Sequence, residues 1–263
     1  MKPTCWIAAL SASFLLSACS ATPTATPDPS WEVIFDGESL AGWTPKIVGQ
    51  AAGSDTTQIF RVEDGAIIVS YEAYDQFDGA FGHLFFADDL SDYRLRFEYK
   101  FFGDQAEGGP GWAFMNSGVM VHAQAPETMQ QDQAFPVSVE AQLLGKRSAE
   151  ASRTTANICT PGTHIEMDGD LVTDHCIGSD TQAGIVGEWV RFEIEVRGGE
   201  TMRLLIAGEE AFVLDNPTYD SGDGDVAQLG ASGPVTHGYF ALQAESHPVA
   251  FRNIELVRLE PAP

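Results

Sequence analysis

The sequence predicts an all-β fold, a single-domain β-sandwich of jelly-roll type, and three observations predict it. Asp-Gly pairs, which favour tight turns, recur along the chain. Between them lie short segments in which apolar and polar residues alternate with the period of two that is typical of half-buried strands. No window shows an amphipathic helix of three turns, and no repeat of fixed period occurs. A body of about 230 residues without a break in composition favours one domain.

The N-terminal residues are expected to be a secretion and anchoring signal. An apolar stretch from Trp6 to Leu16 is too short to span a bilayer as a mature helix. The residues Leu16-Ser-Ala-Cys19 that follow resemble the lipobox of bacterial lipoproteins, in which the peptidase cuts before a cysteine that then carries the lipids. We therefore expect a lipoprotein signal peptide over 1–18 and a lipidated Cys19. Ordinary signal cleavage, with Cys19 incidental, is the alternative.

A tether is predicted between the lipid and the domain. Residues 19–30 are rich in Thr, Pro and Ala and have nothing to bury. No second hydrophobic segment of spanning length occurs, so lipid is the only membrane attachment that we predict. The expected location is the bacterial cell envelope, either at the outer membrane or facing the periplasm or the exterior.

The domain, over residues 31–260, is predicted to consist of strands. In residues 93–102 (YRLRFEYKFF), apolar Leu95 and Phe97 alternate with charged neighbours. The other expected strands, in chain order, are 116–123, 137–144, 190–196, a hairpin over 203–210, 241–245 and 250–259.

Four of these strands carry polar side chains on the face that an apolar core does not need. The rows are Arg96, Glu98 and Lys100; Asn116, Gly118, Met120 and His122; Ser138, Glu140 and Gln142; and Gln243 and Glu245. Flanking valines fix the register, because a shift by one residue would bury these groups. One curved sheet presenting all four rows would form a polar, concave, sugar-sized surface. The alternative is that each row is an ordinary solvated face, with His122 a structural histidine.

Charge excludes some partners. The chain has 38 acidic and 14 basic residues among 263, for a net charge of −24. Such a surface repels phosphate backbones, so we expect no nucleic-acid partner. It would also repel a strongly anionic polysaccharide unless a local basic pocket intervened.

Two cysteines remain after Cys5 and Cys19 are assigned to the signal and the lipid. In an oxidising compartment, Cys159 and Cys176 are expected to form a disulfide. A metal site is the competing interpretation, but no CxxC pair is present and only His164 and His175 lie nearby.

Short motifs in a fixed order resemble the 3-keto-disaccharide hydrolase domain family, over roughly residues 31–260. The family implies a concanavalin A-like jelly-roll sandwich, in agreement with the strand pattern. The motifs are Trp31–Trp43 (WEVIFDGESLAGW), Phe60–Gly65 (FRVEDG), Asn116–Val119 (NSGV), Val139–Leu143 (VEAQL), Ile158–Thr163 (ICTPGT), Leu242–Val249 (LQAESHPV) and Phe251–Ile254 (FRNI). Positions with the family pattern are Asn116, Glu140, Gln142, Gln243, Glu245 and Arg252. Some relatives carry Arg where this chain has His122.

The resemblance implies cleavage of a glycosidic bond in a sugar already oxidised to a ketone at carbon 3. The ketone acidifies the hydrogen on carbon 2, so the reaction needs a base, a stabiliser for the enolate oxygen and an acid for the leaving oxygen. We expect His122 or Glu140 to be the base and Glu245 or an accessible His247 the acid. The expected substrate-binding residues are Arg96, Glu98, Lys100, Asn116, Gln142, Gln243 and Arg252. No cofactor is established; a divalent metal ion held by Glu140 or Glu245 with a histidine could polarise the ketone.

Two other functions remain open. A conventional glycoside hydrolase of laminarinase type would carry ExDxxE on one strand, and the residues around Glu140 (EAQLLG) lack it. A non-catalytic, lectin-like module would stack sugars on aromatic residues, for which Trp43, Trp112 and Trp189 are available.

Overall fold

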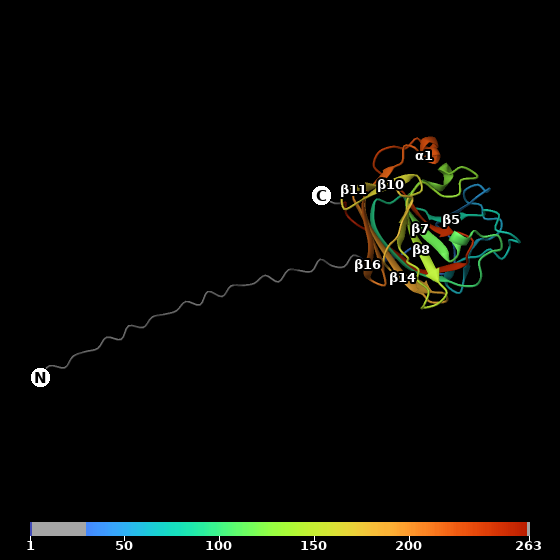
Figure 1. Cartoon of the computed structure of the whole chain (residues 1–263), viewed down its shortest axis with the longest axis horizontal. Coiled ribbons are helices and arrows are strands. Elements are labelled where there is room, and N and C mark those ends of the chain that lie inside the picture. Colours follow the sequence, from blue (N-terminus) through green and yellow to red (C-terminus); the bar gives the residue numbers. More distant parts are fainter. Residues whose placement is uncertain (2–29, 262–263) are drawn as a thin grey trace.

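The computed structural model describes residue 1 and residues 30–261 and shows two β-sheets packed face to face (Figure 1). Nearly all strand pairs are antiparallel, and the only α-helix of the described residues is six residues long. The predicted all-β jelly-roll sandwich is confirmed. The expected signal peptide, the lipidated Cys19 and the tether lie outside the described residues, except for residues 1 and 30.

One sheet has ten strands. In spatial order these are β11 (Asp170–Val172), β10 (Thr163–Met167), β16 (Glu209–Tyr219), β15 (Thr201–Ile206), β14 (Val190–Arg197), β6 (Asp92–Phe101), β18 (Val249–Arg258), β4 (Ala66–Val69) and β3 (Phe60–Glu63), with β1 (Glu32–Val33) paired to β18.

The other sheet has eight strands. In spatial order these are β12 (Cys176–Ile177), β9 (Asn157–Cys159), β8 (Val139–Lys146), β7 (Asn116–Ala123), β17 (Tyr239–Ala244), β5 (Gly82–Phe86) and β2 (Trp43–Ile47), with β13 (Gly184–Ile185) paired to β8. The last long strands of the chain, β17 and β18, enter the middle of separate sheets, so the C-terminal segment joins both layers.

The core lies between the sheets and consists of the apolar sets that alternation predicts. From β6, the ring of Phe97 packs on Phe192 and Phe251 at centroid distances of 5.0 and 5.6 Å. From β7 and β8, the side chains of Val119, Val121, Val139, Ala141 and Leu143 are buried in the same cluster. Because these residues face inward, their neighbours on β7 and β8 face outward.

Turns and short helices connect the strands where the sequence supplies the necessary residues. Asp64 and Gly65 both have positive φ, +51° and +75°, as the two-residue turn between β3 and β4 requires. Asp223 caps the N-terminus of α1 (Gly224–Leu229), which covers one end of the sandwich (Figure 1). Two 3₁₀ turns, η1 (Gly111–Ala113) and η2 (Pro126–Thr128), flank β7. Among the described residues no helix is long and apolar enough to cross a membrane.

Candidate functional site

Three adjacent strands, β8, β7 and β17, bring the predicted polar rows together on the outer face of the eight-stranded sheet. In the antiparallel register, Met120 lies opposite Glu140 and Gly118 opposite Gln142. Gln243 lies opposite His83 on β5. Opposed residues share a face, so residues far apart in the chain form one polar surface.

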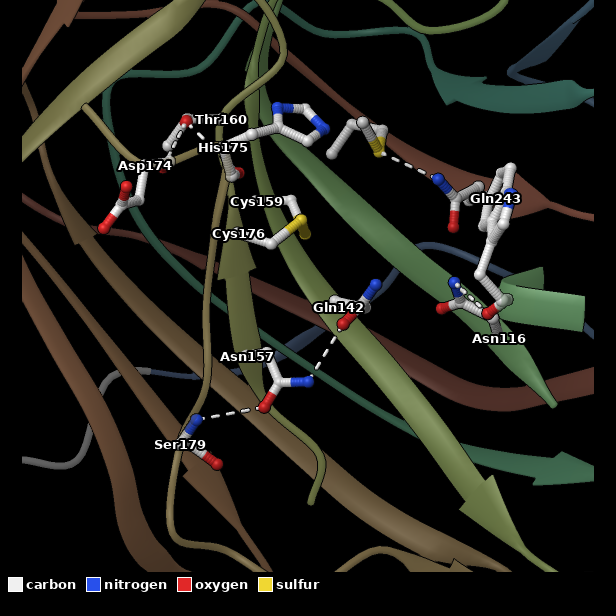
Figure 2. Close-up of a disulfide and its surroundings, with 12 residues drawn as sticks. Asn116, Gln142, Asn157, Cys159, Thr160, Asp174, His175, Cys176, Ser179 and Gln243 are labelled. Carbon is white, nitrogen blue, oxygen red and sulfur yellow. Dashed lines mark hydrogen bonds between the residues drawn. A yellow bond between two sulfur atoms is a disulfide. The ribbon is translucent and has the colours of Figure 1, made fainter. Parts of the chain in front are cut away.

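A pocket of about 390 Å³ opens on this surface, and we call it the glutamate pocket. Its lining residues are Trp112, Asn116, Phe135, Glu140, Gln142, Cys159, Pro161, His175, Cys176 and Glu245. Figure 2 shows Asn116, Gln142 and Gln243 on neighbouring strands beside the disulfide. The pocket is large enough for a sugar ring, and it combines apolar walls with a few polar groups, as small-molecule sites do.

The disulfide forms one wall of the pocket and confirms the predicted pairing. Cys159 on β9 and Cys176 on β12 are direct register partners, and their Cα atoms are 4.1 Å apart. Cys159 is also the register partner of Glu140. The bridge therefore fixes the short edge strand β12 beside the strand that carries this carboxyl group.

Glu140 and Glu245 form a buried pair of carboxyl groups. They are 5% and 3% exposed. Burial raises the pKa of Glu140 to about 8, an effect opposed in part by the neighbouring amide of Gln243. Burial, followed by the nearby charge of Glu140, raises the pKa of Glu245 well above its ordinary value. Two carboxyl groups that disfavour each other's ionisation can divide the roles of base and acid.

Several buried polar atoms around this pair have no hydrogen-bond partner within the described chain. They are Asn116 Oδ1, Glu140 Oε1, Gln243 Oε1 and Glu245 Oε2. Gln243 Nε2 has only the sulfur of Met120, at 3.9 Å. Unpartnered buried polar groups are costly in a folded protein, and such a cluster is typical of a site that awaits a polar ligand.

Neighbouring residues hold these groups in position. A Cβ atom at Gly118 would lie 2.7 Å from Glu140 Oε1, so a larger residue there would displace the carboxyl group. Asn157 Nδ2 donates to Gln142 Oε1 at 2.9 Å, while Asn157 Oδ1 accepts from the backbone N–H of Ser179 at 3.0 Å (Figure 2). Gln142 is thereby oriented by a second strand and a loop.

An aromatic platform lies at the rim. Trp112 is 57% exposed, unusual for so large an apolar side chain. Its ring stacks on Phe81 with an interplanar angle of 9°, and Phe81 contacts Phe135 at 5.0 Å between centroids. Trp112 is therefore the tryptophan placed to contact a ligand in the glutamate pocket. Trp43 is buried in the core.

Sequence reasoning missed His83 and Lys46, which extend the polar surface across β5 and β2. The two are register partners, and both are buried. Burial, with the adjacent Lys46 charge, lowers the pKa of His83 to about 3, so the ring stays neutral, and its Nε2 has no partner. The alternation of β5 places His83 on one face, but only the strand pairing shows that this face is the one with Gln243.

The expected position of His122 is wrong. At this point β7 contains a bulge, in which two residues oppose one on β17, and His122 has φ of +49°. Ala123 takes the outward position, whereas the His122 ring reaches the backbone carbonyl of Gly198 at 2.8 Å, in the turn between β14 and β15 of the other sheet. Burial lowers the pKa of His122. It cannot act as a base in the glutamate pocket.

The expectation that His247 is accessible is also wrong. Its side chain is fully buried and packs edge-on against Phe101 and Phe114, at 5.8 and 5.2 Å between centroids. Burial, followed by the charge of Arg147, lowers its pKa to about 4. The Pro after a histidine indicated an exposed turn, but the segment folds inward against the end of β6.

Arg96, Glu98, Lys100 and Arg252 do not share a sheet with the glutamate pocket, so the expectation of one surface with four rows is wrong. All four belong to β6 and β18 of the ten-stranded sheet, on its outer face. There Arg96 pairs with Glu255, Arg252 pairs with Glu98, and Lys100 lies over the Trp189 ring. Alternation alone cannot tell which sheet a strand joins, and these side chains form two ion pairs and a cation–π contact on the opposite face of the molecule.

The site offers few donors for a metal. Across the described part of the chain, no group of three or more His, Cys, Asp or Glu side chains could hold an ion. Glu140 and Glu245 face the pocket, and the histidine in its lining, His175, does not complete such a set with them. The residues present therefore do not form a metal site by themselves.

Solved structures similar to this chain share its fold. A putative glycosyl hydrolase from Parabacteroides distasonis has 18% sequence identity and a TM-score of 0.51, with 88% of this chain and 94% of that chain covered. A protein of unknown function with a galectin-like fold from Bacillus subtilis has 11% identity and a TM-score of 0.52, with 88% and 100% covered. No curated protein sequence matches this chain.

A family model confirms the resemblance that the sequence motifs carry. The model describes a 3-keto-alpha-glucoside-1,2-lyase-like domain and matches residues 30–257, which includes every strand from β1 to β17 and nearly all of β18. The chain therefore belongs to the family of 3-keto-alpha-glucoside-1,2-lyase-like domains.

Proposed function

We propose that this protein binds a glycoside oxidised to a ketone at carbon 3 and cleaves its glycosidic bond by elimination. Family membership and fold support a glycan-active or carbohydrate-binding sandwich. The observation that carries the finer proposal is the buried pair Glu140 and Glu245, which faces a sugar-sized pocket among unpartnered amide groups.

The chemistry needs one proton removed and one proton delivered. A base takes the hydrogen from carbon 2, which the ketone at carbon 3 acidifies, and the electron pair forms an enolate. The enolate collapses into a double bond between carbons 1 and 2 while the bond from carbon 1 to the leaving oxygen breaks. An acid protonates that oxygen, and water added later across the double bond gives the free keto-sugar.

The different surroundings of the two carboxyl groups assign the two roles. Glu140 ionises as the pH approaches its pKa of about 8, favoured by the neighbouring Gln243 amide, and its ionised form serves as the base. Glu245 is held protonated by burial and, once Glu140 is ionised, by the negative charge of Glu140, and it serves as the acid. One turnover moves a proton from Glu245 to the leaving group and another from carbon 2 to Glu140. Proton exchange between the pair and solvent restores the starting state.

Amide groups hold the sugar and stabilise the enolate. Gln243 Nε2, whose only contact is a weak one to sulfur, can donate to the developing negative oxygen at carbon 3. Asn116 Nδ2 makes only a long contact, 3.5 Å, to the backbone carbonyl of Trp112, so it too can turn toward a ligand. Gln142 and the Trp112 ring supply a hydroxyl partner and a stacking surface.

Turnover of a defined substrate tests the proposal. A 3-keto-α-glucoside and its unoxidised parent are incubated with the wild-type protein, with Glu140→Gln and with the matched control Glu98→Gln on the ten-stranded sheet. We expect the wild type and Glu98→Gln to cleave only the keto-sugar, and Glu140→Gln to lose at least about 100-fold in rate. Full activity in Glu140→Gln would refute the site assignment, and cleavage of the parent alone would instead support a conventional glycoside hydrolase.

A carbohydrate-binding module is the second candidate function. The exposed Trp112 platform favours it, because lectin-like sites stack sugars on such rings. Measurable binding of the keto-sugar or its parent, with turnover of neither, would establish this alternative. Replacing Trp112 with Ala would then abolish binding.

The substrate would have to complete the coordination of any divalent ion, because the described residues do not complete a site for one. Loss of rate on dialysis against a chelator, restored by added metal, would support a role for a divalent ion. An unchanged rate would exclude that role.

We also propose that Cys19 is lipidated and anchors the protein to the bacterial cell envelope, as its lipobox-like sequence indicates. A Cys19→Ala protein should then leave the membrane fraction, and its continued partition into membranes would contradict lipid anchoring.

A further inference from the structure

A second pocket, of about 410 Å³, lies beside the glutamate pocket and is lined by cations. We call it the basic pocket. Its lining residues are Gly111, Trp112, Phe114, Gly145, Lys146, Arg147, Ala151, Ser152 and Arg153. Trp112 lines both pockets, so a molecule that stacks on its ring can reach from one pocket into the other.

The cations of the basic pocket differ from the other arginines of the described chain in lacking a carboxylate partner. Every arginine outside this pocket forms an ion pair: Arg61, Arg94, Arg96, Arg191, Arg197, Arg203, Arg252 and Arg258. No ion pair is formed by Lys146, Arg147 or Arg153 in the same part of the chain. The charge of Lys146 acts on the exposed carboxylate of Glu150, but the two do not form an ion pair. In a protein with 38 acidic and 14 basic residues, three cations gathered in one pocket without an ion pair indicate a site for an external anion.

The pocket is held in shape by one of its own cations. Arg153 Nη1 donates to the backbone carbonyls of Phe114, at 2.6 Å, and Gly145, at 2.9 Å. These bonds connect the loop before β7 to the end of β8, so Arg153 is a positioning residue. Lys146 Nζ makes only a long contact, 3.4 Å, to Gln182 Oε1.

Arg147 is the cation most available to a ligand. Its guanidinium lies over the ring of Phe114, 4.5 Å from the ring centroid, and forms no hydrogen bond in the described chain. Stacking on an aromatic ring fixes the plane of the guanidinium while its N–H groups stay free. A planar, free guanidinium on a fixed support favours a carboxylate, which it can bind through two parallel hydrogen bonds.

We propose that the basic pocket is a subsite for a carboxylate carried by the leaving group of the substrate. This inference rests on the proposed function, in which the oxidised sugar occupies the glutamate pocket and its leaving group extends across Trp112. The rest of the surface repels anions, and the basic pocket would give an acidic leaving group one attractive place to bind.

The test compares two substrates that differ in one charge. They are the 3-keto α-glucosides of 4-hydroxybenzoate and of its neutral amide, 4-hydroxybenzamide. The quantity measured is the ratio of kcat/KM for the carboxylate to that for the amide, in the wild type, in Arg147→Gln and in Arg203→Gln. Arg203 is an ion-paired arginine on β15 and serves as the control. Comparing the ratio between variants cancels the difference in leaving-group acidity.

We expect Arg147→Gln to lower the ratio about fivefold and Arg203→Gln to leave it unchanged. High salt should lower the wild-type ratio in the same direction, because it screens the contact. An equal ratio in all three proteins would overturn the proposal. Binding of the unoxidised glycosides, measured by calorimetry, separates this outcome from failure of the proposed chemistry. If there is no turnover, the subsite is still supported when the wild type binds the 4-hydroxybenzoate glycoside more tightly than the 4-hydroxybenzamide glycoside and Arg147→Gln loses this difference. Equal binding of the two glycosides by the wild type refutes it.

Discussion

At the scale of single residues, the site depends on carboxyl groups that the fold buries at a cost to its own stability. Glu140 lies over Gly118 in a space that a larger neighbour would close, and its Oε1 has no partner. The unfolded chain would ionise this group near 4.5, whereas burial raises the native pKa to about 8. A group maintained in such surroundings is typical of a functional position.

Glu140→Gln should therefore stabilise the protein while it removes activity. Between pH 4.5 and about 8 the unfolded state releases a proton that the native state keeps, so the wild-type free energy of unfolding falls as pH rises. The amide does not titrate, and we expect a gain of about 1–3 kcal/mol at pH 8 that disappears near pH 4.5. Denaturant unfolding at both pH values measures it. A gain equal at the two pH values would show that Glu140 is not neutral in the native state.

His122 provides a residue-scale contrast. His122→Asn should lower thermal stability but leave KM and kcat for the keto-sugar within about twofold of wild type, because the ring contacts the far sheet at Gly198. Asn tolerates the positive φ of this position. Steady-state kinetics test the prediction, and a large fall in kcat at normal stability would return His122 to the mechanism.

At the scale of elements, alternation predicted strands well and predicted their neighbours poorly. Residues 116–123 were expected as a strand and form β7 with the same bounds, and the expected 93–102 corresponds to β6. Alternation also identified Asn116, Glu140 and Gln243 as outward-facing, because valines and leucines occupy the intervening positions. It could not show that β6 belongs to the opposite sheet, since pairing between distant strands leaves no local signal. The bulge at His122 could not be predicted either, because the extra residue in β7 reverses which side chains face outward beyond that point.

The disulfide is the element that closes the pocket wall, and its removal gives a test at this scale. The double variant Cys159→Ala, Cys176→Ala should lose about 3 kcal/mol of unfolding free energy, as expected for a bridge spanning 17 positions. Because β12 has only two residues, we also expect KM for the keto-sugar to rise. Unfolding and kinetics at matched protein concentration measure both effects. Unchanged stability in the double variant would indicate that the bridge only joins elements already fixed.

At the scale of the whole molecule, the two outer faces of the sandwich differ in character. The outer side of the ten-stranded sheet carries ion pairs that neutralise its charge locally, while the outer side of the eight-stranded sheet carries the glutamate pocket and its aromatic rim. Family motifs indicated the fold and most of the pocket, but the folded chain was needed to select Trp112 from three tryptophans and to find His83 and the basic pocket. Each of these features is formed by residues from segments that only the tertiary structure brings together.

Net charge gives a prediction for the molecule as a whole. At a net charge of −24, repulsion among the acidic side chains opposes the compact state. Salt should weaken this repulsion and so stabilise the fold. We expect 0.5 M NaCl, with a Debye length of only a few ångströms, to raise Tm by about 2–4 °C at pH 7. A thermal melt over a salt series measures the effect. A Tm that falls with salt would mean that the ion pairs of the ten-stranded sheet outweigh the net repulsion.

The fate of the hydrogen on carbon 2 tests the account most directly. A 3-keto-α-glucoside that carries deuterium at carbon 2 is cleaved by the wild-type protein, and NMR and rate measurements follow the label. Proton abstraction through Glu140 predicts slower cleavage of the deuterated sugar and loss of the label to solvent, with neither process in Glu140→Gln. Cleavage that retains the deuterium and proceeds at the same rate for both sugars would contradict the central claim.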